Sequence, residues 1–403
     1  MLRVHEWYNP ANSRWELLDK VQKSFQISMV FLGIIPLLFA CSQVNGLTVT
    51  ETINQTSAIQ PLSPTAPESF TQTTPPSQTP LSTNTIIATE TLIPRTVIAF
   101  TGVIVPARCV QAEVDRQGNA DYIYHEVRDI LTGADITVGV FNATISDQVE
   151  YIGCQRSWEL VGSPNNADAL NNAGFDVMSV ATNHIKDCGK QSCGNTAFFD
   201  TLMHFKRVGI SPVGAGKNLS EALKPVVIEV HGIRFGFVSL GEVNERVFAD
   251  AAKPGIAVLT TTNLMNAIER TKNLSDVVIV LPHSGPEDYP QVTPQQKYWA
   301  RHAVAAGANL VVINHAHIVQ GYQEIDSVPV FYSLGNFVFD QIWARDHQQG
   351  MILLVEFEGE QIVNFEFIPT LVDQDGTVHM AEGEEREEIL KRVEKLSKEL
   401  QQD

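Results

Sequence analysis

The sequence predicts an α/β fold whose sheets contain both parallel and antiparallel strands. From about residue 96 onward, apolar runs of strand length alternate with amphipathic runs of helix length, the order expected for parallel sheets. Two pairs of strand-like runs are separated only by short turns, which predicts antiparallel hairpins. The chain has 403 residues, 44% of them hydrophobic, which suffices for one large domain or two ordinary ones.

The predicted elements follow one another along the chain. Strands are expected at 96–106, 134–141, 175–181, 276–283, 309–315 and 328–337, with hairpins over 225–240 and 350–372. Helices are expected at 121–131, 163–174, 195–209, 261–273, 293–308 and 384–403. The helix at 163–174 has a Ser cap and a Gly stop, and the one at 293–308 begins with Thr-Pro. The last helix carries one apolar stripe and a charged, solvated face; the stripe consists of Ile389, Val393, Leu396 and Leu400.

The N-terminal part predicts export and attachment to a membrane. Residues 27–40 are uncharged and apolar, rather short for a spanning helix, and suit the core of a signal peptide. They run into Cys41 as "LFAC", which resembles the bacterial lipobox, so residues 1–41 are predicted to be a lipoprotein signal peptide with Cys41 as the lipidated residue. The alternative is an uncleaved membrane anchor. Both place the rest of the chain on the extracytoplasmic face of the cell membrane.

Residues 42–95 are rich in Ser, Thr and Pro and predict an extended, disordered tether.

Export makes disulfides favourable for the cysteines that follow Cys41. The short "CGKQSC" loop can close on itself as Cys188–Cys193, which leaves Cys109 for Cys154. A zinc site is the rival interpretation, although close Cys pairs of the usual kind are absent.

The net charge and the positions of the polar residues indicate which functions to expect. A net charge of −18 disfavours general nucleic-acid binding. Polar side chains recur where apolar strands end, and the carboxyl ends of strands are where α/β sheets bind ligands. These residues are Asn183, His184, His283, His315, His317, Asn336 and Asp340. Imidazoles and an amide oxygen suit a divalent metal such as zinc, manganese or iron. A hydrogen-bonded structural network is the alternative.

The motifs "FTGVIVPAR", "VATNHIKDCG", "LPHSGPEDY", "INHAHIVQG" and "FYSLGNFVFDQ", in this order, resemble the CapA family of capsule-biosynthesis and poly-γ-glutamate synthesis proteins. The resemblance runs from about residue 98 to 367. It implies the metallophosphatase (calcineurin-like phosphoesterase) superfamily, with a four-layer α/β/β/α sandwich of mixed sheets. The domain is expected at 96–372, followed by a charged C-terminal helix at 373–403.

The resemblance also implies roles for single residues. Asn183, His283 and His315 would coordinate a metal, His317 would serve a neighbouring metal position, and His184 would be the catalytic acid. The same motifs contribute the predicted substrate-binding residues, which are Arg108, Glu287, Asn336 and Asp340.

Two positions depart from the family pattern. Val103 stands where the family usually has an acidic ligand, and Asn142 stands at the end of a segment that usually reads "NLE". Without a bridging carboxylate, two divalent ions a few ångströms apart repel strongly. The sequence therefore predicts at most one ion, unless Asp147 compensates.

Three hypotheses follow. The chain is a surface lipoprotein that acts in the synthesis or export of an anionic envelope polymer of poly-γ-glutamate type, with that polymer or its synthesis machinery as partner. It could also be a metal-dependent hydrolase of the envelope, in which a metal-polarised water attacks. The third hypothesis is a degenerate, non-catalytic lipoprotein that binds a polymer or a partner.

Overall fold

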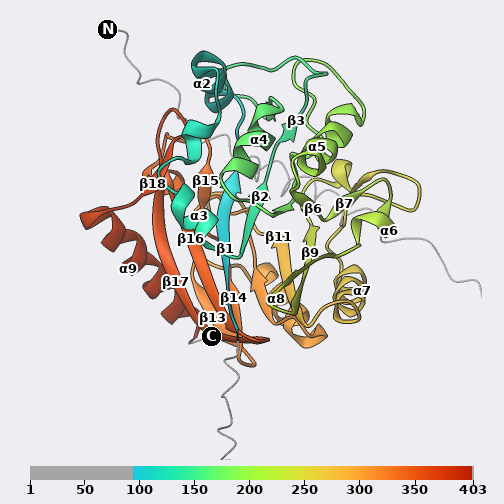
Figure 1. Cartoon of the computed structure of the whole chain (residues 1–403), viewed down its shortest axis with the longest axis vertical. Helices are drawn as coiled ribbons and strands as arrows, with labels where there is room; N and C mark the ends of the chain where they lie inside the picture. Colours follow the sequence, from blue (N-terminus) through green and yellow to red (C-terminus); the bar gives the residue numbers. More distant parts are fainter. Residues whose placement is uncertain (1–93, 402–403) are drawn as a thin grey trace, which may run out of the picture. The chain divides into compact units, whose positions relative to one another are not determined.

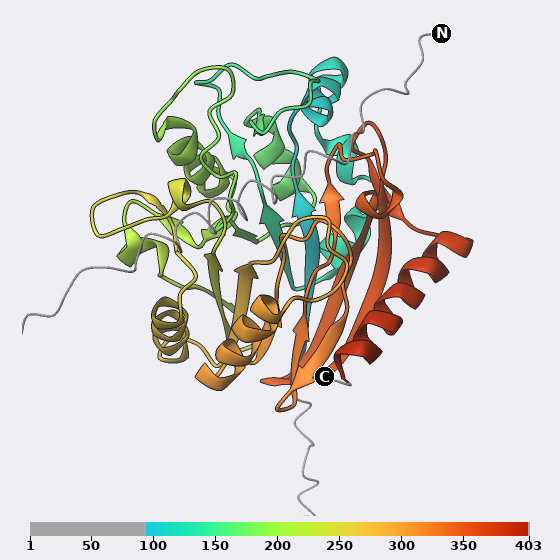
Figure 2. The same cartoon turned by 180° about the vertical axis from the view of Figure 1, so that it is seen from behind.

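The computed structural model describes residues 94–401, in which two β-sheets lie face to face and helices cover their outer faces (Figures 1 and 2). This is the predicted α/β/β/α order with mixed sheets. The predicted signal peptide 1–41, with Cys41, and the tether up to residue 93 lie outside the described residues. Between residues 94 and 401, no helix combines the length and apolarity needed to cross a membrane.

The first sheet is built around β1 (Arg95–Ile104). On one side of β1 follow three strands parallel to it, which are β2 (Ile136–Phe141), β5 (Val177–Ser179) and β6 (Ser211–Val213). On the other side, antiparallel to one another, lie β16 (Gln349–Glu358), β17 (Gln361–Val372) and β18 (Val378–Met380). The short β15 (Asn336–Val338) pairs in parallel with the end of β1, where Val103 is the register partner of Asn336.

The second sheet has four parallel strands in its centre and one antiparallel strand at each edge. The central strands are β9 (Ile233–Gly241), β11 (Val277–His283), β12 (Leu310–Val312) and β14 (Val328–Phe331). The edge strands are β8 (Val226–Val230) and β13 (Tyr322–Ile325). Two small two-stranded pairs complete the strands, namely β3 (Thr144–Ile145) with β4 (Val161–Gly162) and β7 (Ala215–Gly216) with β10 (Gly255–Ile256).

The core between the sheets follows from the alternation of apolar residues along each strand. In β11, Val277, Ile279 and Leu281 belong to the apolar cluster between the sheets, whereas Val278 and Val280 belong to the cluster beneath the outer helices. Successive side chains of a strand point to opposite faces, so a strand buried on both faces is apolar throughout. Such burial is what fixes the position of the polar residues at the strand ends.

Helices cover the outer face of each sheet. The first sheet is covered by α2 (Cys109–Gln117), α3 (Arg128–Gly133), α4 (Asn165–Asn172) and α5 (Thr196–Arg207), and the second by α6 (Leu219–Ala222), α7 (Thr261–Lys272) and α8 (Pro294–Ala306). Short 3₁₀ turns lie at Asp121–Tyr124, Glu245–Val247 and Arg345–His347. The last helix, α9 (Gly383–Leu400), runs along β17 and buries the predicted stripe, since Ile389 is fully buried and Leu400 is 8% exposed (Figures 1 and 2).

Three of the predicted segments have a different structure, and α2 and β13 were not predicted. Residues 328–337, expected as one strand, form β14 in the second sheet and β15 in the first, because the chain crosses between the sheets at Gly335, whose φ is +72°. The helix expected at 121–131 is a 3₁₀ turn followed by the short α3. In the C-terminal part, residues 378–380 are strand β18, and the helix begins only at Gly383.

Both predicted disulfide pairs are present in the structure. Cys109 at the start of α2 is bonded to Cys154, and Cys188 is bonded to Cys193. The four sulfur atoms are therefore used in bonds, and the rival zinc interpretation of these cysteines does not apply.

Candidate functional site

The predicted polar residues gather where strands of both sheets end. Asn183 follows β5 of the first sheet, and His283 ends β11 of the second, yet the Nε2 atom of His283 lies 3.0 Å from Oδ1 of Asn183. The rings of His283 and His315 lie 4.7 Å apart, and those of His315 and His317 lie 5.9 Å apart. The carboxyl ends of the parallel strands thus bring the four side chains into one cluster.

The two histidines after β12 face the same cluster from a segment in which the backbone has left the strand. His315 has a φ of +119° and His317 a φ of +60°. Residues other than Gly rarely adopt positive φ, and such strained conformations concentrate at functional sites. On a regular strand, residues two apart already point to the same face, so the positive φ angles set where the two rings lie and not whether they share a side.

Hydrogen bonds orient the rings of His315 and His317. The Nδ1–H of His315 donates to the carbonyl of Gly285 over 2.6 Å, and the Nδ1–H of His317 donates to Oδ1 of Asn336 over 2.7 Å. The amide group of Asn336 is itself fixed, since its Nδ2 donates to Gln341 and to the carbonyl of His347. Both histidines therefore keep the lone pair of Nε2 available, the arrangement usual for metal-binding histidines. Asn336 positions His317.

Burial favours the neutral forms of His283 and His317. Burial lowers the pKa of His317 to about 4, and together with the neighbouring imidazoles it lowers the pKa of His283 well below its usual value. The carboxylate of Glu287 lies 3.5 Å from Nε2 of His315. Burial would raise the pKa of Glu287, but the attraction of His315 and the other imidazoles outweighs burial and lowers this pKa to about 2. The cluster thus contains imidazole nitrogens next to one ionised carboxylate.

His184 differs from His315 and His317 because the partner of its Nδ1–H is a carboxylate. Its Nδ1–H donates to Oδ2 of Asp187 over 2.7 Å, and the same oxygen accepts the backbone N–H of Leu160. Burial would lower the pKa of His184, but the hydrogen bond and the charge of Asp187 outweigh it and raise this pKa above its usual value. A histidine with a raised pKa can hold a proton near neutral pH and donate it, which is what the predicted acid role requires.

One separation in the donor set is compatible with a shared metal ion. Neighbouring ligand atoms about 2.1 Å from an octahedral ion lie about 3 Å apart. Asn183 Oδ1 and His283 Nε2 have this separation, and here they form a hydrogen bond. Nε2 of His315 is buried and has no hydrogen-bond partner among the described residues. However, residues 94–401 contain no group of three or more His, Cys, Asp or Glu side chains arranged to hold a metal. The fit therefore depends on the amide of Asn183.

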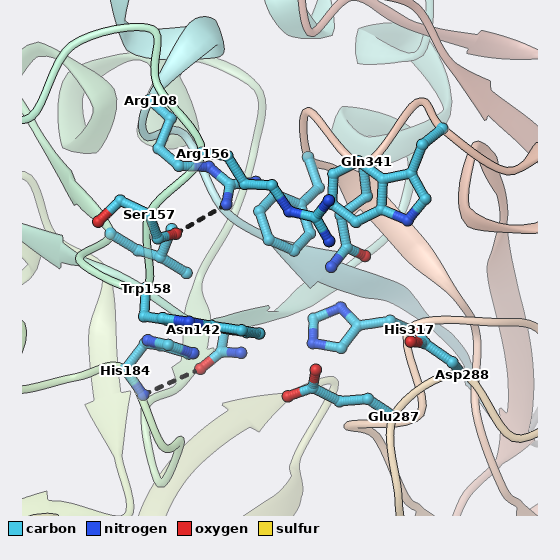
Figure 3. A pocket seen from close by; sticks show the side chains of 13 residues that line it. Arg108, Asn142, Arg156, Ser157, Trp158, His184, Glu287, Asp288, His317 and Gln341 are labelled. Atoms are coloured by element: carbon cyan, nitrogen blue, oxygen red, sulfur yellow. Dashed lines mark hydrogen bonds between the residues drawn. The ribbon is translucent and has the colours of Figure 1, made fainter. Parts of the chain in front are cut away.

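The cluster opens into a cavity of about 340 Å³, which His184, Glu287 and His317 line together with Asn142 (Figure 3). Asp147, the residue considered for compensation, is exposed, bonds to Gln148 and does not line this cavity. Val103 is fully buried in the core.

Arg108 and Asp340 are paired with each other. Their side chains form a buried ion pair with exposed fractions of 6% and 8%, and Asp340 also accepts the backbone N–H of Cys109. Arg108 lines the cavity and donates from Nη1 to the carbonyl of Ser157, whereas Asp340 does not line it. This pair therefore supports the wall of the cavity.

Sequence reasoning missed the loop over residues 150–160, which forms one rim of the cavity. It contributes Arg156, Ser157 and Trp158 (Figure 3). Trp343 also lines the cavity and contacts the guanidinium of Arg156. The loop has no periodic pattern, but Cys154 is bonded to the residue next to Arg108, so the disulfide itself indicated that this loop lies at the site.

A search among protein families matches residues 97–341 to the model of the bacterial capsule synthesis protein PGA_cap. This match spans more than half of the chain. The chain belongs to this family. Every cavity residue from Arg108 to Gln341 lies within the matched range.

Individual relatives of this PGA_cap chain agree. It is 30% identical over 267 residues to the capsule biosynthesis protein CapA of Bacillus anthracis, covering 64% of this chain and 63% of that protein. It is 29% identical over 256 residues to the PGA biosynthesis protein CapA of Bacillus subtilis (strain 168), covering 63% of this chain and 66% of that protein. The chain thus spans just under two thirds of these curated relatives. The solved structure of the NAD nucleotidase NadN of Haemophilus influenzae is also similar, with 14% identity and a TM-score of 0.39 over 75% of this chain and 56% of that one, too distant to inform the function.

Proposed function

We propose that this chain acts in the synthesis or export of an anionic envelope polymer of poly-γ-glutamate type, attached by Cys41 to the extracytoplasmic face of the cell membrane. The observation that carries the proposal is that the family match includes the whole His cluster and every residue lining its cavity except Trp343. The names of the two Bacillus relatives supply the polymer class. Fold alone would not supply it, because one fold hosts many functions.

Complementation tests this role. The gene would be expressed in a bacterium that lacks its own CapA-type protein, and surface γ-glutamate polymer would be measured. We expect wild type to restore the polymer and His283→Ala with His315→Ala to fail. His302→Ala is the matched control, since His302 is a partly exposed histidine on α8, away from the cluster. Equal polymer from the double variant would exclude a role for the cluster.

Membrane attachment needs its own test. Labelled palmitate should mark the wild-type chain, and Cys41→Ala should lose the label and release the protein from the membrane fraction. Unchanged fractionation without any label in wild type would leave the uncleaved anchor as the explanation.

The lone pairs of the cluster favour a second candidate, a metal-dependent hydrolase. Asn183, His283 and His315 would hold one divalent ion, and His317 would line the same pocket. A bound ion would supply Lewis acidity to an ester or amide oxygen. His184 would hold the proton at Nε2 for a leaving group, while Asp187 keeps its ring in place.

Elemental analysis of the purified chain separates the candidates. We expect at most one Mn, Zn or Fe ion per chain, lost in His283→Ala and in His315→Ala. Two firmly bound ions would show that another carboxylate, such as Glu287, completes a second site. No metal, with polymer production unaffected by His184→Gln, would identify a non-catalytic binding protein.

A further inference from the structure

The side chain of Asn142 presents an unused hydrogen-bond donor to the cavity. Asn142 is fully buried, and its Oδ1 accepts the backbone N–H of His184 over 3.2 Å, which fixes the orientation of the amide. A flipped amide would put two donors against each other. Its Nδ2 has no hydrogen-bond partner among the described residues and lies beside the cavity (Figure 3). A buried donor without a partner costs free energy, so a ligand oxygen that accepts from it is favoured.

Arg156 supplies a positive charge on the rim of the same cavity. Its guanidinium lies 4.7 Å from the ring centre of Trp343, a cation–π contact that holds the group in place. Figure 3 shows the side chain reaching over the cavity towards His317 and Gln341. In the part of the chain that the structure describes, no carboxylate forms an ion pair with Arg156, in contrast to Arg108, which is neutralised by Asp340.

The loop that carries Arg156 is held rigidly at several points. Cys154 is bonded to Cys109, and the carboxylate of Glu159 accepts the backbone N–H groups of Cys188 and Gly189 over 2.8 and 3.1 Å. The backbone N–H of Lys190 donates to the carbonyl of Glu150 at the start of the loop. The second disulfide closes the turn that makes these contacts. A loop fixed in this way loses little conformational entropy on binding, which favours affinity.

We infer that Asn142 and Arg156 bind a carboxylate group of the substrate chain in this cavity, which Trp158 and Trp343 also line. The inference rests on the proposed function, because γ-linked glutamate carries one free carboxylate per residue. Both groups are N–H donors, and charge-assisted bonds from a guanidinium suit a planar carboxylate. The nearby carboxylates of Glu287 and Asp288 also line the cavity and would repel a doubly charged phosphate more strongly. The two tryptophans are 74% and 51% exposed, so planar amide groups of the chain can stack on them.

Calorimetry on the full chain in detergent tests the inference, with γ-linked pentaglutamate as the probe. Arg156→Gln should weaken binding about tenfold to a hundredfold, the range for a lost charged hydrogen bond. Asn142→Asp should also weaken it, and should at the same time raise the affinity for Mn²⁺, which a merely structural role would not do. Arg270→Gln on α7, exposed and away from the cavity, is the control and should bind as wild type. Circular dichroism checks that each variant is folded.

Two further probes separate failure of the subsite from failure of the polymer assignment. The γ-linked isoglutamine pentamer, in which every free α-carboxylate is replaced by an amide, should not bind. Oligogalacturonate supplies carboxylates on a sugar chain. Binding of oligogalacturonate alone, lost in both variants, would keep the subsite and reject the poly-γ-glutamate assignment. Wild-type affinity in both folded variants, equal binding of the isoglutamine pentamer, or no binding of any carboxylate probe would overturn the inference.

Discussion

Removing the disulfides one at a time should destabilise the protein to different degrees. The Cys109–Cys154 bond closes a sequence separation of 45 residues, and the Cys188–Cys193 bond closes one of 5. A cross-link removes entropy from the unfolded chain by about 2.1 + 1.5R ln n cal/mol/K. At 25 °C this gives about 4 kcal/mol for the long loop and about 2 kcal/mol for the short one. The free energy of unfolding should fall by these amounts.

The assay is urea unfolding without reductant, followed by tryptophan fluorescence and by far-UV circular dichroism. In each variant both cysteines of one pair are replaced by Ala, so no free thiol remains. The two probes should give coincident transitions, which is the condition for comparing free energies. Because Cys154 lies two residues before Arg156, the long-loop variant should also weaken γ-glutamate binding, whereas a purely thermodynamic role would leave affinity unchanged.

Equal losses from the two variants, or a larger loss from Cys188→Ala with Cys193→Ala, would refute the entropic reasoning. The short loop would then stabilise the native state through its contacts with Glu159 and Glu150, not through the unfolded chain.

Three further predictions concern buried charges. Asp340→Ala should lower the free energy of unfolding in urea by about 3–5 kcal/mol because it leaves Arg108 buried and unpaired. The double variant Arg108→Met with Asp340→Leu should lose less. A smaller loss from Asp340→Ala would mean that water reaches the guanidinium. Val103→Asp places a carboxylate in a fully buried position, so the melting temperature in EDTA should fall below that of wild type, and added Mn²⁺ should restore it. A melting temperature that does not respond to Mn²⁺ would place this residue outside the metal pocket. Burial and the charge of Lys253 lower the pKa of Lys186 to about 8. Between pH 8 and about 10.5 the unfolded chain then binds more protons, so stability should rise with pH over this window. Lys186→Met should remove that rise in the urea midpoint, and a persisting rise would assign it to other groups.

The sequence predicts those parts of the site that depend on strand ends. An apolar run predicts a strand, and a parallel sheet brings the carboxyl ends together, so the positions of Asn183, His283 and His315 along the chain suffice to group them. Periodicity carries no information on which sheet a strand joins. Residues 328–337 therefore read as one strand, although Gly335 lets the chain cross from the second sheet to the first.

The loop over residues 150–160 could not be predicted from periodicity because disulfides and side-chain to backbone bonds hold it, and none of these leaves a repeating pattern. The proximity of Glu287 to His315 was missed for a related reason. The two residues lie on different loops, and their approach depends on the left-handed backbone of His315, which a non-glycine residue adopts only when its surroundings impose it.

Asn142 connects the two departures from the family pattern to the proposed ligand. A carboxylate at this position would attract a second cation and repel an acidic polymer, whereas the amide lacks charge and points a donor at the cavity. One ion held by neutral ligands would keep most of its charge, and that charge would attract the substrate carboxylate to the same place. The number of metal ions and the charge of the ligand are therefore not independent properties of this site. Asn142→Asp changes both at once, and measuring metal content and γ-glutamate affinity on that one variant shows whether they move in opposite directions as this coupling requires.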